Sequence, residues 1–257
     1  MCMNVTTNQP YTICITTFNQ RFESLQKLIK SIRAGSDVPI LVSINGNVNA
    51  LLDEEYRQKS LIFFSQYKNV YPIFFTEMRG LAKMFNTLII HSSTENILML
   101  NDDLEITDVQ FFLDLEKAFE YNNDICKLQT EWYGSFSHFI FKKSYIINEI
   151  GFFDERLLGF GEEDGDITFK YIQKTNKEIP CYTVRGLIHY HSDIRHDIKP
   201  GVGKYSFYNR NFMFNEKYKL GEGTISGMFG QPATMLDPDK KQYPYEQYFA
   251  ENKNKLI

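Results

Sequence analysis

Apolar and polar positions along the first half of the chain follow the pattern of strands that alternate with helices. Apolar and β-branched residues predict strands at Tyr11–Thr17, Val38–Ile44, Val70–Phe75 and Ile97–Leu100. Pro72 indicates that the third strand is short or begins late. The fourth is a continuous apolar run, which is typical of a strand buried on both faces of a parallel sheet.

A helical pattern follows each of these strands. After the first strand, apolar residues recur at helical spacing until Gly35, which ends the helix. Similar patterns occupy Leu51–Tyr67 and Leu81–Ile89, and another helix is expected to begin near Val109. Four strand–helix alternations in roughly the first 120 residues predict βαβ units. The fold class is therefore α/β, with a mostly parallel sheet.

The pattern changes after Asp124. Strands are predicted at Ile125–Gln129 and Ser137–Phe141, and a helix is predicted at Lys143–Ile150. A dense acidic loop then spans Gly151–Asp166. A second helix is expected to begin near Asp166 and to run to about Lys174.

A late strand is predicted at Pro180–Tyr190, and it ends in the segment H-Y-H-S-D, which begins at His189. Strand alternation would place His189 and His191 on the same face. The tail from Lys199 onward is rich in aromatics, glycines and lysines, which indicates a wrapping extension rather than a second domain.

Composition narrows the class of protein. The chain has 257 residues, 43% of them hydrophobic, which is enough for one large α/β domain or two small ones. The net charge of −4, without a run of basic residues, disfavours nucleic acid as a partner. The sequence predicts no transmembrane segment and no signal peptide. Four widely spaced cysteines predict reduced thiols in a cytoplasmic protein.

Two familiar nucleotide-binding motifs are missing from the sequence. No G-x-G-x-x-G follows the first strand, which disfavours a dinucleotide site. The stretch Gly201–Lys204 is not a phosphate-binding loop, because Tyr205 stands where Ser or Thr is required.

The acidic residues that follow the fourth strand are the first candidate for chemistry. Asn101, Asp102 and Asp103 come directly after the apolar run, and ligands of open α/β sheets bind at the carboxyl ends of strands. Carboxylates there are suited to Mg²⁺ or Mn²⁺ that also carries phosphate oxygens. The tripeptide alone is equally compatible with a solvated turn that caps the next helix.

Several motifs in the same order along the chain point to a known family. They are I-T-T-F-N from residue 15, I-N-G-N from 44, R-G-L-A-K-M-F-N from 79, L-N-D-D from 100, G-F-F-D-E from 151, G-F-G-E-E-D-G-D from 159 and H-S-D from 191. This set resembles the family 2-type glycosyltransferases of the GT-A fold, with a second half similar to galactosyltransferases. The resemblance covers residues 11–218. It implies a Rossmann-like nucleotide-binding sheet, mostly parallel, with helices on both faces, and a C-terminal extension.

The resemblance implies roles for residues of the first half. Residues expected to contact the nucleotide sugar are Thr16, Phe18, Asn45, Arg79, Lys83, Asn86, Asn101 and Asp102. Asn45 and Asn101 each replace an Asp of the family pattern. Asp103 keeps the position of the metal ligand.

In the second half, the resemblance assigns the catalytic base to Asp164, with Glu163 as its neighbouring rival. The residues alone also allow Asp164 or Asp166 to cap the helix. H-S-D points to His191 as the second metal ligand, with His189 as the residue that could be confused with it. Acceptor contacts are expected at Trp132, Tyr133, Asp154 and Glu162.

The implied function is metal-dependent, inverting transfer of a hexose or N-acetylhexosamine from a nucleotide sugar, most simply a UDP-sugar. The cofactor would be Mn²⁺ or Mg²⁺, and the acceptor a glycan or lipid-linked glycan of bacterial surface polysaccharide synthesis. The family analogy implies work at the cytoplasmic face of the membrane, with peripheral contact. A sugar nucleotidyltransferase and a non-catalytic glycan-binding module are the alternatives. The former would need a glycine-rich basic loop after the first strand, which I-T-T-F-N-Q-R lacks.

The expected domain organisation is a single GT-A catalytic domain at residues 1–199 and a wrapping extension at 200–257. Within the catalytic domain, residues 1–124 would bind the nucleotide sugar. Residues 125–199 would provide the acceptor contacts and the catalytic base.

Overall fold

The structure is a computed structural model, and it describes residues 10–18, 21–46, 53–121, 124–130, 134–159, 161–190 and 209–219. The chain divides into two compact units. Unit 1 comprises Met1–Met78, Thr87–Gly151 and Ile179–His191, and unit 2 comprises Arg79–Asn86, Phe152–Glu178 and Ser192–Ile257. In the part of the chain that is described, no helix is long and apolar enough to cross a membrane.

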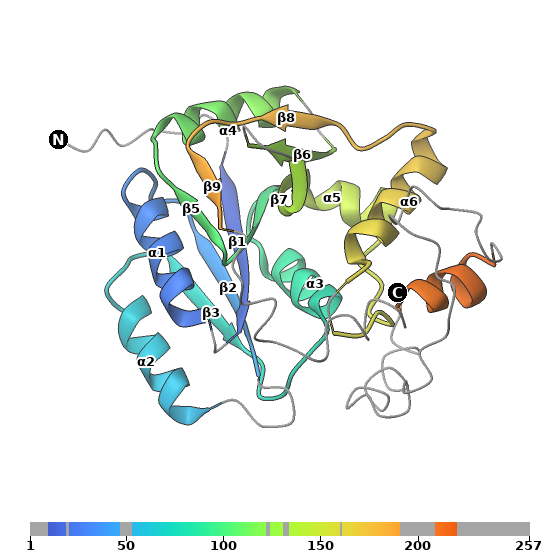
Figure 1. Ribbon diagram of the computed structural model, residues 1–257. Helices are drawn as coiled ribbons and strands as arrows, with labels where there is room; N and C mark the ends of the chain where they lie inside the picture. Colours follow the sequence, from blue (N-terminus) through green and yellow to red (C-terminus); the bar gives the residue numbers. More distant parts are fainter. Residues whose placement is uncertain are drawn as a thin grey trace. The chain divides into compact units, whose positions relative to one another are not determined.

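A seven-stranded sheet forms the centre of unit 1 (Figure 1). In spatial order its strands are β3 (Val70–Phe74), β2 (Ile40–Asn45), β1 (Tyr11–Phe18), β4 (Asn96–Asn101), β7 (Gly134–Lys142), β6 (Ile125–Gln129) and β8 (Cys181–Thr183). The first four are parallel to one another, β7 is antiparallel to both of its neighbours, and β8 is parallel to β6. The predicted mostly parallel α/β sheet is confirmed.

Helices cover both faces of this sheet. Among the described residues, five helices lie within unit 1: α1 (Phe22–Arg33), α2 (Glu54–Phe64), α4 (Gln110–Tyr121), α5 (Lys143–Tyr145) and the π-helix η2 (Ile146–Ile150). A further helix, α3 (Leu81–His91), begins in unit 2 and ends in unit 1. Ile13 and Ile15 of β1 share one apolar core with α1, α2 and α4. Cys14, which points to the other face by strand alternation, donates from Sγ to the carbonyl of Leu88 in α3.

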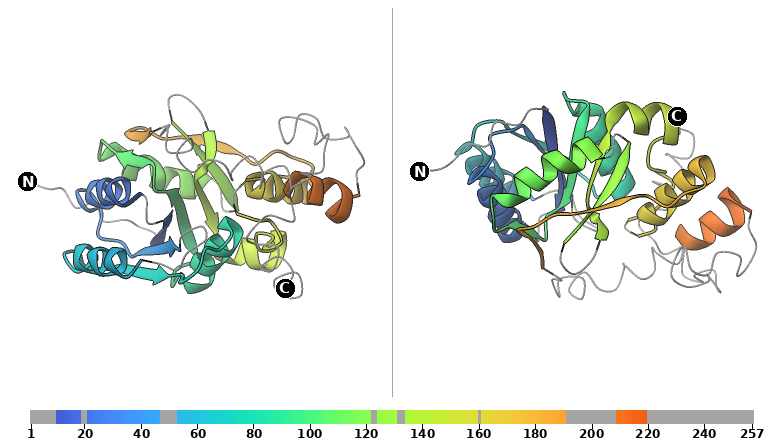
Figure 2. Two further views of the ribbon diagram at one scale, coloured as in Figure 1. Left: turned by 60° about the horizontal axis from the view of Figure 1, so that its bottom comes forward. Right: turned by 90° about the horizontal axis from the view of Figure 1, so that it is seen from above.

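The apolar stripe predicted after the first strand forms the buried face of α1. Phe22, Leu25, Leu28, Ile29 and Ile32 are all buried, which is the spacing of one face of an α-helix. The ring of Phe22 also packs edge-on against rings of α2, so that α1 and α2 lie side by side (Figure 2).

A second, two-stranded sheet was not anticipated. β5 (Leu104–Ile106) pairs antiparallel with β9 (Leu187–His189), and Leu104 lies opposite His189. The single strand predicted at Pro180–Tyr190 is therefore wrong: this stretch forms β8 and β9 in two different sheets. The chain turns between them at Gly186, whose φ of +71° is in the region that favours glycine.

Unit 2 is built around α6 (Glu163–Thr175) and the π-helix η3 (Phe212–Lys217). The helix expected to begin near Asp166 begins earlier, at Glu163. Asp164 and Asp166 consequently lie within its first turn and are not its N-cap, which is Glu162. Residues 152–162, here called the 152–162 loop, lead into this helix.

Candidate active site

The carboxyl ends of three parallel strands of unit 1 meet at one edge of the sheet. Thr16 of β1 lies opposite Ser43 of β2 and Asn101 of β4, and Phe18 lies opposite Asn45. The Thr16 hydroxyl donates to Oδ1 of Asn101 over 3.4 Å. Sequence positions predicted to contact the nucleotide are thus brought to one edge, where ligands of open α/β sheets bind.

Asp102 joins the end of β4 to the end of β1. Its carboxylate accepts hydrogen bonds from the Thr17 hydroxyl at 2.6 Å and from the Arg21 guanidinium at 2.7 Å. Burial raises the pKa of Asp102 to about 6, although Arg21 and Thr17 act in the opposite direction. Because both oxygens bind protein groups, the geometry gives Asp102 a structural role beside the predicted nucleotide contact.

Asp103 lies beside His189. Its Oδ1 is 3.4 Å from Nε2 of His189, and its Oδ2 is 3.5 Å from the Arg21 guanidinium. The Asp103 carbonyl accepts the backbone N–H of Tyr190 at 2.8 Å, so the pairing of β5 with β9 holds the two side chains together. Burial alone would raise the pKa of Asp103, but His189 and Arg21 lower it below its usual value.

The Asp103–His189 pair fits one divalent ion. Ligands at neighbouring corners of an octahedral ion with bonds of about 2.1 Å are about 3 Å apart, close to the separation seen here. Carboxylate oxygen with imidazole nitrogen suits Mn²⁺. Within the described residues, no group of three or more His, Cys, Asp or Glu side chains gathers as a metal site. Phosphate and water oxygens would therefore complete the coordination.

Two residues near this pair were not anticipated from the sequence. Arg21 is the N-cap residue of α1 and is buried against Asp102. His138 of β7 is fully buried, with its ring centre 6.1 Å from that of His189. Burial, together with the charge of His189, lowers the pKa of His138 to about 4, so this imidazole is neutral at physiological pH. The sequence could have indicated His138, because it is a polar residue beside the apolar run of a predicted strand.

Some predicted site residues lie outside the described part of the chain. These are His191, Trp132 and Tyr133, and the side chain of Phe18. Their assignments stay predictions.

In unit 2, two adjacent carboxylates have different environments. Asp164 is exposed, and its Oδ1 accepts the N–H of Gly165 at 2.8 Å. Glu163 is buried, and its Oε2 accepts the N–H of Gly161 at 2.7 Å. Burial, aided by the charges of Asp164 and Glu162, raises the pKa of Glu163 to about 8. Of the two, Asp164 is the one that an acceptor in solution can reach.

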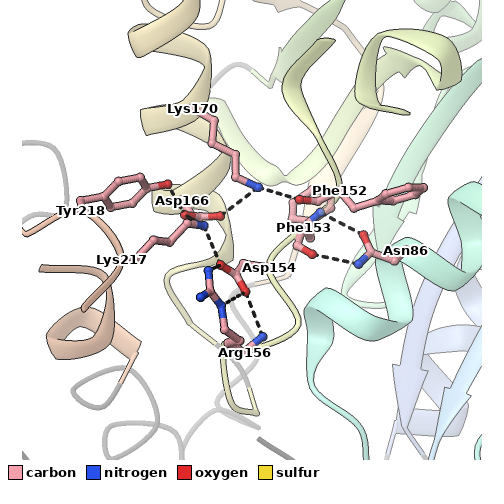
Figure 3. Close-up of polar contacts among 9 residues, drawn as sticks. All are labelled: Asn86, Phe152, Phe153, Asp154, Arg156, Asp166, Lys170, Lys217 and Tyr218. Atoms are coloured by element: carbon pink, nitrogen blue, oxygen red, sulfur yellow. Dashed lines mark hydrogen bonds and ion pairs between the residues drawn. The ribbon is translucent and has the colours of Figure 1, made fainter. Parts of the chain in front are cut away.

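Two predicted acceptor residues are engaged in buried ion pairs. Asp154 pairs with Arg156 and with Lys217, each at 2.7 Å (Figure 3). Burial would raise the pKa of Asp154, but these two cations hold it well below its usual range. Glu162 pairs with Arg210 at 2.8 Å. In this structure both carboxylates therefore hold unit 2 together.

The residues expected to approach the diphosphate lie at the beginning of α3. Arg79 is half-buried just before this helix, and Lys83 pairs with Glu155 at 3.2 Å. Asn86 is buried, and its amide bonds the backbone of Phe153. The structure thus gives Lys83 and Asn86 partners from the 152–162 loop.

Four parallel strands flanked by an antiparallel one, with acidic residues at the end of β4, define a glycosyltransferase of the GT-A fold. The chain belongs to Glycosyl transferase family 2, which matches residues 12–175. No curated protein matches the chain. The galactosyltransferase-like character of the second half stays a prediction.

Solved structures of glycosyltransferases share this fold. Glucosyl-3-phosphoglycerate synthase from Mycobacterium tuberculosis, in complex with Mn²⁺, UDP and glucosyl-3-phosphoglycerate, has a TM-score of 0.57 and 10% identity over 88% of this chain and 81% of that one. GalNAc-T7 with UDP, GalNAc and Mn²⁺ has a TM-score of 0.63 and 10% identity, covering 94% of this chain but 54% of GalNAc-T7. TarS 1–349 of S. aureus with UDP has a TM-score of 0.51, with 10% identity, and covers 82% of this chain and 74% of that one. At these identities the likeness shows the fold alone.

Proposed function

We propose that this glycosyltransferase transfers a hexose or N-acetylhexosamine from a UDP-sugar to a glycan acceptor, with inversion at the anomeric carbon. The observation that carries the proposal is the Asp103–His189 pair beside the carboxyl end of β4. Its support from related structures is that UDP and Mn²⁺ are bound in the synthase and in GalNAc-T7.

On the donor side, the residues of unit 1 bind and orient the nucleotide sugar. Thr16, Asn45 and Asn101 offer polar side chains at the edge of the sheet where the nucleotide would bind. Asp103 and His189, with His191 as the alternative histidine, would hold Mn²⁺ or Mg²⁺. When bound, the ion supplies positive charge against the two phosphates and the leaving group.

On the acceptor side, Asp164 is the proposed general base. Inverting transfer requires a carboxylate that takes the proton of the acceptor hydroxyl as its oxygen attacks the anomeric carbon. Asp164 is exposed at the first turn of α6 and has one oxygen engaged by the N–H of Gly165. Glu163, with its pKa raised to about 8 by burial, would hold a proton near neutral pH.

The proposed acceptor is a glycan or lipid-linked glycan of bacterial surface polysaccharide synthesis, made at the cytoplasmic face of the membrane. The support is analogy with the glycosyltransferase family. Trp132 and Tyr133 are the proposed surfaces on which an acceptor sugar stacks.

The test is a panel of nucleotide sugars assayed for Mn²⁺-dependent hydrolysis and transfer. Asp103→Ala should abolish activity and Mn²⁺-dependent UDP binding, while the circular dichroism spectrum stays that of a folded chain. If Asp103→Ala binds UDP with Mn²⁺ as tightly as the parent, the proposed donor site is wrong.

A side-by-side measurement of Asp164→Asn and Glu163→Gln tests the base. Transfer by Asp164→Asn should fall by about 10²–10⁴-fold, since an amide does not accept the proton. UDP binding should stay unchanged, because the proposed metal ligands Asp103 and His189 belong to unit 1, and neither substitution changes them. A comparable loss in Glu163→Gln alone would move the base to Glu163. If neither variant loses transfer, neither carboxylate is the base and the mechanism is a different one.

A further inference from the structure

The 152–162 loop contains no helix or strand in its described residues, although it leads directly to Asp164. Its end adopts left-handed backbone at Gly159, Gly161 and Glu162, with φ values of +54°, +109° and +74°. Such a conformation is costly for Glu162, and it persists only where surrounding contacts fix it. Besides the pairing of Arg156 with Asp154 inside the loop, contacts with other segments therefore contribute to its shape.

Two buried asparagines provide these contacts in the same way. Asn86 accepts the N–H of Phe153 at 3.0 Å through Oδ1 and donates to the carbonyl of Phe153 at 2.9 Å through Nδ2 (Figure 3). Asn209 accepts the N–H of Leu158 at 2.6 Å and donates to the carbonyl of Leu158 at 2.9 Å. Each amide thus holds both polar groups of one loop residue, as a neighbouring strand would.

The second N–H of each amide is also used. In Asn86 it donates to Glu155 at 3.0 Å, and in Asn209 it donates to the carbonyl of Gly161 at 2.8 Å. Asn209 is fully buried and Asn86 is 3% exposed. With every N–H donor of both amides engaged by the loop, their contacts serve the loop rather than a ligand.

We infer that Asn86 and Asn209 are positioning residues, which hold the 152–162 loop at both ends and so set where the chain places Asp164. The inference rests on the glycosyl transfer proposed above. It gives Asn86 a different role from the diphosphate contact expected from the sequence. It also assigns a role to Asn209 of the predicted wrapping extension, which would help to position the proposed catalytic base.

Asn→Asp variants keep the size of the side chain and an acceptor oxygen, but they lose both N–H donors and, when ionised, add a negative charge. The test pair is Asn86→Asp and Asn209→Asp. Asn69→Asp is the matched control: Asn69 also donates from Nδ2 to a backbone carbonyl, that of Asp37, but at an exposed site in unit 1. Three properties are measured for each variant: amide hydrogen exchange in residues 152–162, Mn²⁺-dependent UDP binding, and transfer from UDP-glucose and UDP-N-acetylglucosamine to a panel of nitrophenyl glycosides.

In both test variants we expect faster hydrogen exchange in the loop and a kcat for transfer that falls by roughly 10–100-fold, the effect of misplacing a reacting group. The KM for the donor and the affinity for UDP should stay within about twofold, a split that general unfolding would not give. Asn69→Asp should match the parent in all three measurements.

Unchanged exchange in the loop, or unchanged transfer in both test variants, overturns the positioning role while leaving the proposed function intact. If Asn86→Asp weakens UDP binding while hydrogen exchange in the loop stays unchanged, Asn86 contacts the diphosphate, as the sequence predicts. A parent chain that fails to bind UDP with Mn²⁺, or that transfers to no glycoside, overturns the proposed function and with it the positioning role.

Discussion

At the scale of single residues, burial and pairing separate carboxylates that look alike in the sequence. Asp154 and Glu162 are neutralised by cations, whereas Asp164 is exposed. Glu163 is buried, and burial together with the negative charges of Asp164 and Glu162 raises its pKa. The acidic loop therefore contains anchoring carboxylates, one exposed carboxylate and one that favours its protonated form.

The raised pKa of Glu163 predicts a pH-dependent stability. Between the ordinary pKa of 4.5 and the folded value of about 8, the folded chain holds a proton that the unfolded chain has lost. The contribution of this group is thus fully present below pH 4.5 and is lost as pH rises through about 8. At about 1.4 kcal/mol for each unit of pKa, the loss is at most about 5 kcal/mol.

Glu163→Gln, which cannot ionise and can still accept the Gly161 N–H, should remove this dependence. Urea unfolding at pH 5 and pH 9 should therefore show the variant gaining stability relative to the parent as pH rises. An equal difference between variant and parent at both pH values would contradict the assignment.

At the scale of elements, the small β5–β9 sheet holds His189 beside Asp103. The chain enters β9 through Gly186, where an added Cβ would meet Asp108 at 2.6 Å. Gly186 also accepts the N–H of Thr107 at 2.8 Å. A side chain at this position would displace the beginning of β9, and with it the histidine.

We therefore expect Gly186→Ala to lower both stability and Mn²⁺-dependent UDP binding. Gly151→Ala is the matched control, since Gly151 also has positive φ, +86°, but no atom within 4 Å of an added Cβ. The control should lose about 1–3 kcal/mol from backbone strain alone and bind UDP normally. Binding lost in both variants, or in neither, would contradict a specific role of the turn at Gly186.

Near the end of η3, the side chain of Lys217 provides another long-range contact. Its ammonium lies 2.7 Å from Asp154 and 2.5 Å from Asp166, and both carboxylates are almost fully buried (Figure 3). Removing this cation would leave two buried carboxylates without one of their positive partners. Burying a charge without its partner strongly destabilises a folded protein.

Lys217→Met should therefore lower the free energy of unfolding by about 3 kcal/mol or more in urea titrations. Arg57→Met, which removes an exposed pair with Glu54 on α2, should change it little. A Lys217→Met chain as stable as the parent would show that the network contributes nothing to folding.

At the scale of the whole molecule, nucleotide binding should be visible as thermal stabilisation. A ligand at 100 times its Kd adds about 2.7 kcal/mol to the folded state. For a chain of this size that corresponds to a rise in Tm of about 5–10 °C. UDP with Mn²⁺ should produce such a rise, and UDP with a chelator should not. A rise of the same size with the chelator present would show that UDP binds without a metal.

The sequence by itself determined the α/β class, the order of β1 to β4 and the acidic end of β4. These features depend on local periodicity and on the rule that parallel strands end at one edge. The structure contains these elements with boundaries shifted by one or two residues. For example, the strand predicted at Val38–Ile44 is β2 at Ile40–Asn45. The family could also be recognised from the sequence, because its motifs follow one another in order along the chain.

Only the tertiary structure decided which candidate residues are paired. Arg21 meets Asp102 across 81 positions of sequence, and Asn209 meets Leu158 across 51. Two short strands in separate sheets replace the single strand predicted near His189, since β9 is specified by its pairing with β5 rather than by its own three residues. Local patterns give a residue its element, but burial and charge neutralisation depend on partners that folding brings from distant segments.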